Sequence, residues 1–234
     1  MAKAPKTAYV CNDCGAEFSR WQGQCSACKA WNTISEVRLI SASNSTKNDR
    51  FSGYAGETRA KIQTLSEISL QETPRFTSGF KELDRVLGGG IVPGSAILIG
   101  GHPGAGKSTL LLQVMCGLAK NMTALYVTGE ESLQQVAMRA NRLNLPTDKL
   151  NMLSETSVEQ ICNLADQLKP QIIVVDSIQV MHLSDIQSSP GSVAQVRECA
   201  SFLTRYAKTR QVAIIMVGHV TKDGTLAGPK VLEH

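Results

Sequence analysis

The sequence feature that most constrains the fold of this chain is a glycine-rich motif at residues 101–108. It reads Gly101-His-Pro-Gly-Ala-Gly-Lys-Ser108 and fits the pattern G-x-x-x-x-G-K-S/T at every required position. An apolar run at 96–100 precedes it and an amphipathic stretch at 106–120 follows it. Because this motif cradles phosphate between a strand and a helix, the sequence predicts an α/β nucleotide-binding domain.

The residues of this loop differ in the chemistry expected of them. Backbone N–H groups curl around phosphate oxygens, and the helix N-terminus adds partial positive charge. Lys107 is expected to reach the β- and γ-phosphates of ATP, Ser108 to ligate Mg²⁺, and Thr109 to contact the α-phosphate. His102 is expected to have no chemistry of its own and either to shape the loop or to lie exposed to solvent. The residues predicted to bind ATP or ADP are Gly101, His102, Pro103, Gly104, Ala105, Gly106, Lys107, Ser108 and Thr109.

Three further apolar runs, at 124–128, 172–176 and 212–218, alternate with helix candidates at 131–143, 157–168 and 192–209. The runs are continuously apolar, as is typical of strands buried on both faces of a parallel sheet. Right-handed crossovers between such strands give a doubly wound architecture. The predicted fold class is therefore α/β, a P-loop NTPase core with a mainly parallel doubly wound sheet.

Acidic residues follow two of these runs. Asp176 ends the run at 172–176, where a carboxylate binds Mg²⁺ in phosphate-loop ATPases, and we expect its strand to neighbour the phosphate-loop strand. The alternative is an aspartate that caps the following segment. Glu130 and Glu131 follow the run at 124–128, and one of them, preferably Glu130, is expected to orient water for attack on the γ-phosphate. The alternative is favourable charge in the first turn of a helix. The predicted catalytic residues are Lys107, Glu130 and Asp176.

Four of the seven cysteines form the pattern Cys11-x2-Cys14-x10-Cys25-x2-Cys28. Two such C-x2-C turns offer four thiolates to a tetrahedral Zn²⁺, and a site filled by four protein ligands is structural. The alternatives are two disulfides or four unligated thiols, and a cytosolic context disfavours disulfides. Gly15 suits a turn position with positive φ.

Both tryptophans of the chain, Trp21 and Trp31, lie in this cysteine-rich segment, together with Arg20, Gln22 and Lys29. Aromatic rings beside cations are typical of surfaces that bind single-stranded nucleic acid. The alternative is that the tryptophans pack the small core and the charges are only solvated.

The chain divides into three parts. We expect a zinc-binding module at 1–38, a linker rich in Ser, Asn and Gly at 39–64, and an ATPase domain at 65–234. A module this short needs its metal in order to fold. The net charge of +4 does not by itself indicate nucleic acid, and no apolar run reaches the roughly 20 residues of a membrane helix. Without a secretory signal either, a cytoplasmic chain with no membrane partner is expected.

Several segments together carry a resemblance to a known family. Residues 76–94, from Phe76-Thr-Ser-Gly-Phe80 to Gly94, precede the phosphate loop, and Gly129-Glu-Glu-Ser132 follows it. With Trp21-Gln-Gly-Gln-Cys-Ser-Ala-Cys28 and Gly191-Ser-Val-Ala-Gln-Val-Arg197, they resemble the RadA (Sms) family of bacterial DNA-repair proteins, which have a RecA-like core. The resemblance implies a helicase-like, DNA-dependent ATPase that processes recombination intermediates and promotes branch migration in the RecA recombinase pathway. It also implies a homo-oligomer, a hexameric ring that acts on single-stranded and branched DNA.

The same resemblance implies two loops that face DNA. They are Met181–Gly191 and Val220–Lys230, with Lys222 and Lys230 expected to meet phosphates. The alternative is that both loops form subunit contacts. The resemblance also implies that His219, at the carboxyl edge of the sheet, senses the γ-phosphate; the alternative is a hydrogen-bonded structural residue.

Proteins of that family continue beyond the last residue here, with a Lys-Asn-Arg-Phe-Gly motif and a C-terminal domain resembling Lon protease. We therefore expect a C-terminally truncated chain with an incomplete sheet. Two other functions stay open at this point. One is a nucleotide-gated DNA-binding module without turnover, and the other is a RecA-fold signalling ATPase that binds proteins.

Overall fold

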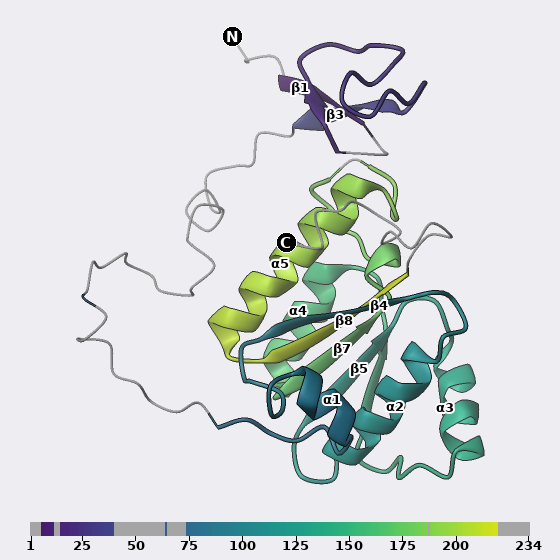
Figure 1. Cartoon of the computed structure of the whole chain (residues 1–234), viewed down its shortest axis with the longest axis vertical. Helices are drawn as coiled ribbons and strands as arrows, with labels where there is room; N and C mark the ends of the chain where they lie inside the picture. The colour runs from purple at the N-terminus through teal and green to yellow at the C-terminus, as the bar shows by residue number, and fades with distance from the viewer. Residues whose placement is uncertain (1–5, 12–14, 40–63, 65–73, 187, 220–234) are drawn as a thin grey trace.

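The computed structural model describes residues 6–11, 15–39, 64, 74–186 and 188–219 (Figure 1). The N-terminal part is an antiparallel sheet in the order β2-β1-β3, formed by β1 (Lys6–Cys11), β2 (Glu17–Phe18) and β3 (Ile34–Leu39). Among the module side chains that the structure describes, the buried ones are Cys11, Cys25 and Ile34. So small an apolar core is what we expect of a module that depends on a metal.

The larger part is built on a five-stranded sheet whose strands are all parallel. The strand order is β4 (Ala96–Gly101), β8 (Ala213–His219), β7 (Ile172–Asp176), β5 (Ala124–Thr128) and β6 (Asn151–Ser154). The predicted α/β class is confirmed. One expectation was wrong: β7, which carries Asp176, does not neighbour the phosphate-loop strand, because β8 pairs with both β4 and β7 and lies between them.

Helices cover both faces of this sheet (Figure 1). Against one face lie α4 (Val158–Leu168) and α5 (Val193–Arg210). Against the other lie α1 (Lys81–Val86), α2 (Lys107–Leu118) and α3 (Leu133–Arg142). A 3-10 turn, η2 (Ile178–Val180), follows β7. The arrangement is the doubly wound one that the sequence predicts.

The central strands send alternate side chains to the two faces. On β7, Ile173 and Val175 join the core under α4 and α5, whereas Ile172 and Val174 join the core under α2 and α3. All of β5 and β7 and most of β8 are buried, whereas β4, which pairs only with β8 in the described part of the sheet, is mostly half-buried. The prediction of strands buried on both faces is therefore confirmed for the three central strands.

Serines fix the starts of three helices. Ser132, Ser157 and Ser192 each accept a hydrogen bond from the backbone N–H three residues on, and each of those residues is a glutamine. At Ser132 the glutamine side chain returns the bond and completes a capping box. These local caps explain why α3, α4 and α5 begin within two residues of their predicted starts.

No strands were predicted in the N-terminal part, and in the larger part the helix α1 and the strand β6 have no counterpart among the predicted elements. Both are short, and β6 reads Asn-Met-Leu-Ser, which lacks an apolar run. In the N-terminal part, β3 extends to Leu39, one residue past the predicted boundary, and residues 40–63 of the predicted linker lie outside the described residues. Among the residues that the structure describes, no helix is long and apolar enough to cross a membrane.

Candidate active site

The phosphate loop joins β4 to α2, in the context that the motif requires. Gly104 and Gly106 both adopt positive φ. The buried Lys107 donates from Nζ to the carbonyl oxygens of Gly101, at 2.7 Å, and His102, at 2.9 Å. Residues 102–106 are exposed. The Lys107 ammonium is therefore held by loop carbonyls, while residues 102–106 of the loop stay accessible to a ligand.

Strand register brings the predicted residues to one edge of the sheet. Gly101 on β4 pairs with His219 on β8, and Thr128 on β5 pairs with Asp176 on β7. Because these strands are parallel, the loops that follow them share the carboxyl edge, where open α/β sheets bind their ligands. The phosphate loop, His219, Asp176 and the segment with Glu130 all meet there.

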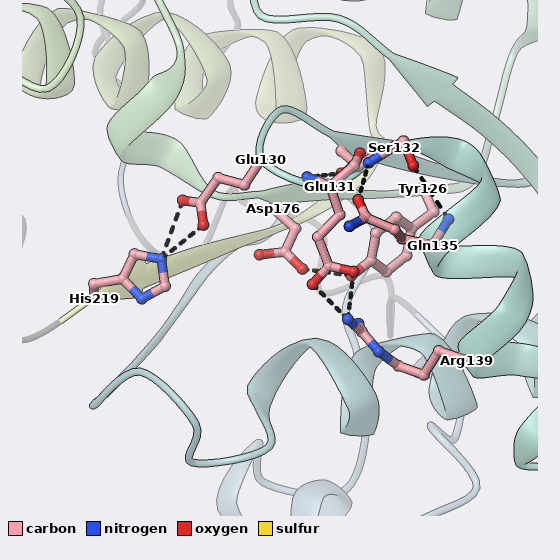
Figure 2. Close-up of polar contacts among 9 residues, drawn as sticks. Tyr126, Glu130, Glu131, Ser132, Gln135, Arg139, Asp176 and His219 are labelled. Carbon is pink, nitrogen blue, oxygen red and sulfur yellow. Dashed lines mark hydrogen bonds and ion pairs between the residues drawn. The ribbon is translucent and has the colours of Figure 1, made fainter.

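Asp176 is held by a tyrosine that the sequence analysis did not single out. Tyr126 Oη lies 2.5 Å from Asp176 Oδ2, and both side chains are buried (Figure 2). Burial, and then the charge of Asp176 and the hydrogen bond to it, raise the pKa of Tyr126, so the phenol stays protonated and donates. One oxygen of the Asp176 carboxylate is thereby fixed by the phenol. The sequence signal that could have pointed to Tyr126 is a single tyrosine within the otherwise mainly aliphatic strand β5.

Glu130 contacts two side chains that come from neighbouring strand ends. The Ser177 hydroxyl donates to Glu130 Oε1. His219 Nε2 lies 3.1 Å from Glu130 Oε1 and 3.3 Å from Oε2 (Figure 2). The Glu130 side chain is 38 % exposed. His219 Nδ1 is buried and has no hydrogen-bond partner among the described residues. Sequence reasoning named Glu130 and His219 separately, but it found neither their contact nor Ser177.

Glu131 has a different set of partners. Both of its carboxylate oxygens accept from Arg139 Nη2 on α3. This hydrogen bond is the main cause that raises the pKa of Arg139. The Glu131 backbone N–H and carbonyl both bond the hydroxyl of Thr128. Because Glu131 is engaged in holding the start of α3, Glu130 is the carboxylate of the pair that faces His219.

Gly129 allows the segment after β5 to approach the segment after β7. A Cβ at Gly129 would lie 2.5 Å from Val180 Cγ2, which is too close for any side chain. The Gly129 N–H donates to the carbonyl of Asp176 at 2.9 Å. This close approach brings Glu130 within reach of Ser177.

The first of the two predicted DNA-facing loops, Met181–Gly191, is organised by one buried glutamine. The side chain of Gln195 on α5 bonds the backbone of Leu183, Ile186 and Ser188 at 2.9–3.3 Å. Three described residues of the loop are therefore gathered around the Gln195 side chain. The second loop, Val220–Lys230, with Lys222 and Lys230, lies outside the described residues.

The cysteines of the N-terminal sheet fit a zinc ion. The Sγ atoms of Cys11, Cys25 and Cys28 lie within 4.8 Å of one another, and those of Cys11 and Cys28 are 3.7 Å apart. Thiolates at about 2.3 Å from a tetrahedral Zn²⁺ are about 3.8 Å apart, whereas a disulfide brings sulfurs to about 2.0 Å. Thr33 Oγ1 adds a polar contact to Cys11 Sγ at 3.2 Å. The fourth predicted ligand, Cys14, lies outside the described residues.

The two cysteine turns share one backbone pattern. In each, the fourth residue after the first cysteine, Gly15 after Cys11 and Lys29 after Cys25, donates its N–H to the carbonyl of that cysteine. Gly15 and Lys29 both have positive φ, of 74° and 64°, which confirms the turn predicted at Gly15. The repeated turn presents thiolates as zinc ribbons do.

Trp21 and Trp31 do not form the core of this module. Their exposed fractions are 59 % and 69 %. The interpretation that they pack the small core was therefore wrong; Tyr9, Ala16 and Phe18 pack there instead.

Known protein families match both the cysteine-rich N-terminal part and the larger part of the chain. The family described as AAA domain matches residues 60–225, and the family described as Rubredoxin metal binding domain matches residues 9–36. Proteins named "DNA repair protein RadA" are 94 % identical over 234 residues in Haemophilus influenzae, 73 % over 235 in Escherichia coli and 46 % over 235 in Bacillus subtilis. Each match covers 100 % of this chain and 51 % of the relative, so the chain spans about half the length of these relatives. The chain therefore belongs to the AAA domain family, and the resemblance to RadA proteins that its motifs predict is confirmed along its whole length.

Proposed function

We propose that this chain binds and hydrolyses ATP at the carboxyl edge of its parallel sheet and couples hydrolysis to DNA. The observation that carries the proposal is the contact between Glu130 and His219, at the point where His219 pairs with the first residue of the phosphate loop. A carboxylate in this position has both oxygens engaged yet remains partly exposed to water. The coupling to DNA is supported by the relatives, which are named DNA repair proteins.

The residues of the site divide the reaction among themselves. Lys107 exchanges the carbonyls of Gly101 and His102, which it bonds here, for the β- and γ-phosphates. Ser108 and Asp176 would hold Mg²⁺. When bound, Mg²⁺ neutralises charge on the transferring phosphoryl group. Glu130 orients a water and accepts its proton as the water oxygen bonds the γ-phosphorus. The bond to the β–γ bridging oxygen breaks, and ADP and phosphate leave.

His219 is the residue that we propose to connect the nucleotide with DNA. Its Nε2 donates to Glu130, and its Nδ1 has no partner in the described part of the chain, so one ring nitrogen is left for a group that comes and goes with the nucleotide. The loop expected to carry Lys222 and Lys230 to DNA phosphates follows His219 directly. Loss of the γ-phosphate would then change the loop through the backbone of His219.

In the whole protein we propose that this unit processes recombination intermediates and promotes branch migration. It would act in the cytoplasm, as a hexameric ring on single-stranded and branched DNA, in the RecA recombinase pathway. The proposed division of the chain is a zinc module at 1–38, a linker at 39–64 and an ATPase domain at 65–234.

ATP hydrolysis by this chain, with and without single-stranded DNA, tests the proposal. We expect Lys107→Ala to abolish turnover, and Glu130→Gln to lower it by about 100-fold or more while nucleotide binding persists. Glu131→Gln is the matched control, since Glu131 bonds Arg139 and should affect turnover far less. Unchanged hydrolysis in Lys107→Ala would refute the site. Strong loss in Glu131→Gln but not in Glu130→Gln would exchange their roles. Turnover that ignores DNA would favour a signalling ATPase.

A further inference from the structure

We propose that Trp21 and Trp31 form a stacking platform for single-stranded nucleic acid on the zinc module, distinct from the loops of the ATPase sheet. The inference deepens the proposed function and rests on DNA being a ligand of this chain. Its starting point is that both tryptophans are exposed, at 59 % and 69 %, although indole is among the largest apolar side chains.

The two indoles converge on one glycine. A Cβ at Gly23 would lie 3.8 Å from Trp21 Cη2 and 3.9 Å from Trp31 Cζ3, so the outer edges of both six-membered rings lie close to the same backbone position. Because Gly23 has no side chain, nothing from this residue separates the rings. The result is a pair of adjacent aromatic surfaces that are open to solvent.

The backbone under the rings is well held. Gln24 and Trp31 form an antiparallel bridge, and the Asn32 N–H donates to the carbonyl of Gly23 at 2.8 Å. The Gln24 side chain donates to the carbonyl of Lys29 at 2.9 Å. Cys25, a candidate zinc ligand, follows Gln24 directly, so metal binding stiffens the same loop. A preorganised platform loses little conformational entropy when a base stacks on it.

The surroundings of the rings favour nucleic acid over a protein partner. Among residues 15–34, the charged side chains whose placement is described are Arg20 and Lys29; both are cationic and both are exposed. In this described part of the module, the exposed large apolar side chains are the two tryptophans. A protein interface has a continuous apolar centre, whereas single-stranded nucleic acid needs exposed rings for its bases and cations for its phosphates. The second pattern is the one seen here.

The chain contains its own reporter for this surface. Trp21 and Trp31 are its only tryptophans, so emission excited at tryptophan-selective wavelengths reports this module alone. We expect titration of the zinc-loaded chain with an oligo-dT strand to quench this emission saturably. Binding is measured in parallel by the anisotropy of a fluorescently labelled strand, which responds to DNA bound anywhere on the chain.

Variants separate stacking from other causes of quenching. The double variant Trp21→Ala with Trp31→Ala is expected to lower the affinity for the labelled strand by about tenfold or more. The double variant Trp21→Phe with Trp31→Phe keeps aromatic rings at both positions and should retain most of the affinity. Arg20→Gln should lower the salt dependence of binding by roughly 0.7 in log–log slope. Val86→Ala on α1, an equally exposed apolar position at 67 %, is the control and should change nothing. Zinc content is measured for every variant, to show that the module is folded.

The outcomes distinguish this proposal from the proposed function. If the labelled strand binds but emission is unchanged, or if the Ala pair binds as well as the parent, the platform is refuted and the ATPase proposal stands. If no strand binds and hydrolysis ignores DNA, both fail, and the ring pair is better assigned to a protein partner.

Discussion

The zinc module and the parallel sheet are stabilised in opposite ways. The module buries Cys11, Cys25 and Ile34 and leaves both of its tryptophans in solvent. The sheet buries nearly all of its central strands between two layers of helices. A short segment cannot bury enough apolar surface to offset its loss of conformational entropy, so metal–sulfur bonds replace the core. The two tryptophans of the module are therefore left on its surface, whereas the buried Tyr126 of the sheet holds a carboxylate.

The comparison predicts its largest effect at the zinc ligands. Cys25→Ser, or chelation of the metal, is expected to unfold the module, since zinc binding contributes about 10–16 kcal/mol in comparable small units. Zinc content should fall and the anisotropy of tryptophan emission should drop as the rings become mobile. The thermal unfolding of the sheet should not change. Cys116→Ser, which alters a buried thiol of α2 outside the module, is the control. Simultaneous melting of both parts would contradict this prediction.

The second prediction concerns the apolar core of the sheet. Leu203 on α5 is fully buried, and Leu203→Ala should lower the free energy of unfolding by about 2–5 kcal/mol. Leu164→Ala on α4, where the side chain is 41 % exposed, should cost about 0.5 kcal/mol or less. Urea denaturation followed by circular dichroism measures both. The zinc content and the anisotropy of tryptophan emission of both variants should match those of the parent chain. A loss of either would show that the stability of the module depends on the sheet.

A third prediction concerns Tyr126, the buried aromatic residue of β5 that donates a hydrogen bond to Asp176. Tyr126→Phe removes the donor to Asp176 Oδ2 and leaves a buried carboxylate oxygen without its partner, at a cost of about 1–3 kcal/mol. We expect the Mg²⁺ concentration for half-maximal hydrolysis to rise several-fold, with recovery at high Mg²⁺. Tyr206→Phe is the matched control, because Tyr206 bonds Asp166 on the surface, away from the site. An unchanged Mg²⁺ dependence in Tyr126→Phe would remove Tyr126 from the site.

The last prediction concerns two buried thiols on the helices α4 and α5, whose effect is confined to alkaline pH. Burial raises the pKa of both Cys162 and Cys199 from 9.0 to about 12. The unfolded chain releases these protons first, so the free energy of unfolding should fall as pH rises from about 9 toward 12. Both thiols should also react slowly with iodoacetamide in the folded chain, whereas the module cysteines should react once zinc is removed. Mass spectrometry identifies the alkylated positions, and rapid native labelling of Cys199 would contradict this burial.

Local patterns were enough to predict much of this molecule. The strands at 124–128 and 172–176 have the predicted bounds, because a continuous apolar run marks its own strand. A serine cap likewise marks the start of the helix that directly follows it, as Ser132 does for α3. The phosphate loop and the cysteine pairs are likewise short motifs whose spacing carries the chemistry. The short elements α1 and β6 escaped prediction because their sequences hold too few residues to show a period.

What the sequence by itself determined is therefore the parts: a phosphate loop between strand and helix, an alternating α/β core, and a four-cysteine ribbon. Tertiary structure alone decided how the parts meet. It inserted β8 between β4 and β7, joined Tyr126 to Asp176 across 50 residues, and set Glu130 against His219 across 89. It also turned Trp21 and Trp31 outward. The physical reason is range: a periodic pattern reports the burial of its own segment, whereas strand order and side-chain partners depend on which distant segments pack together.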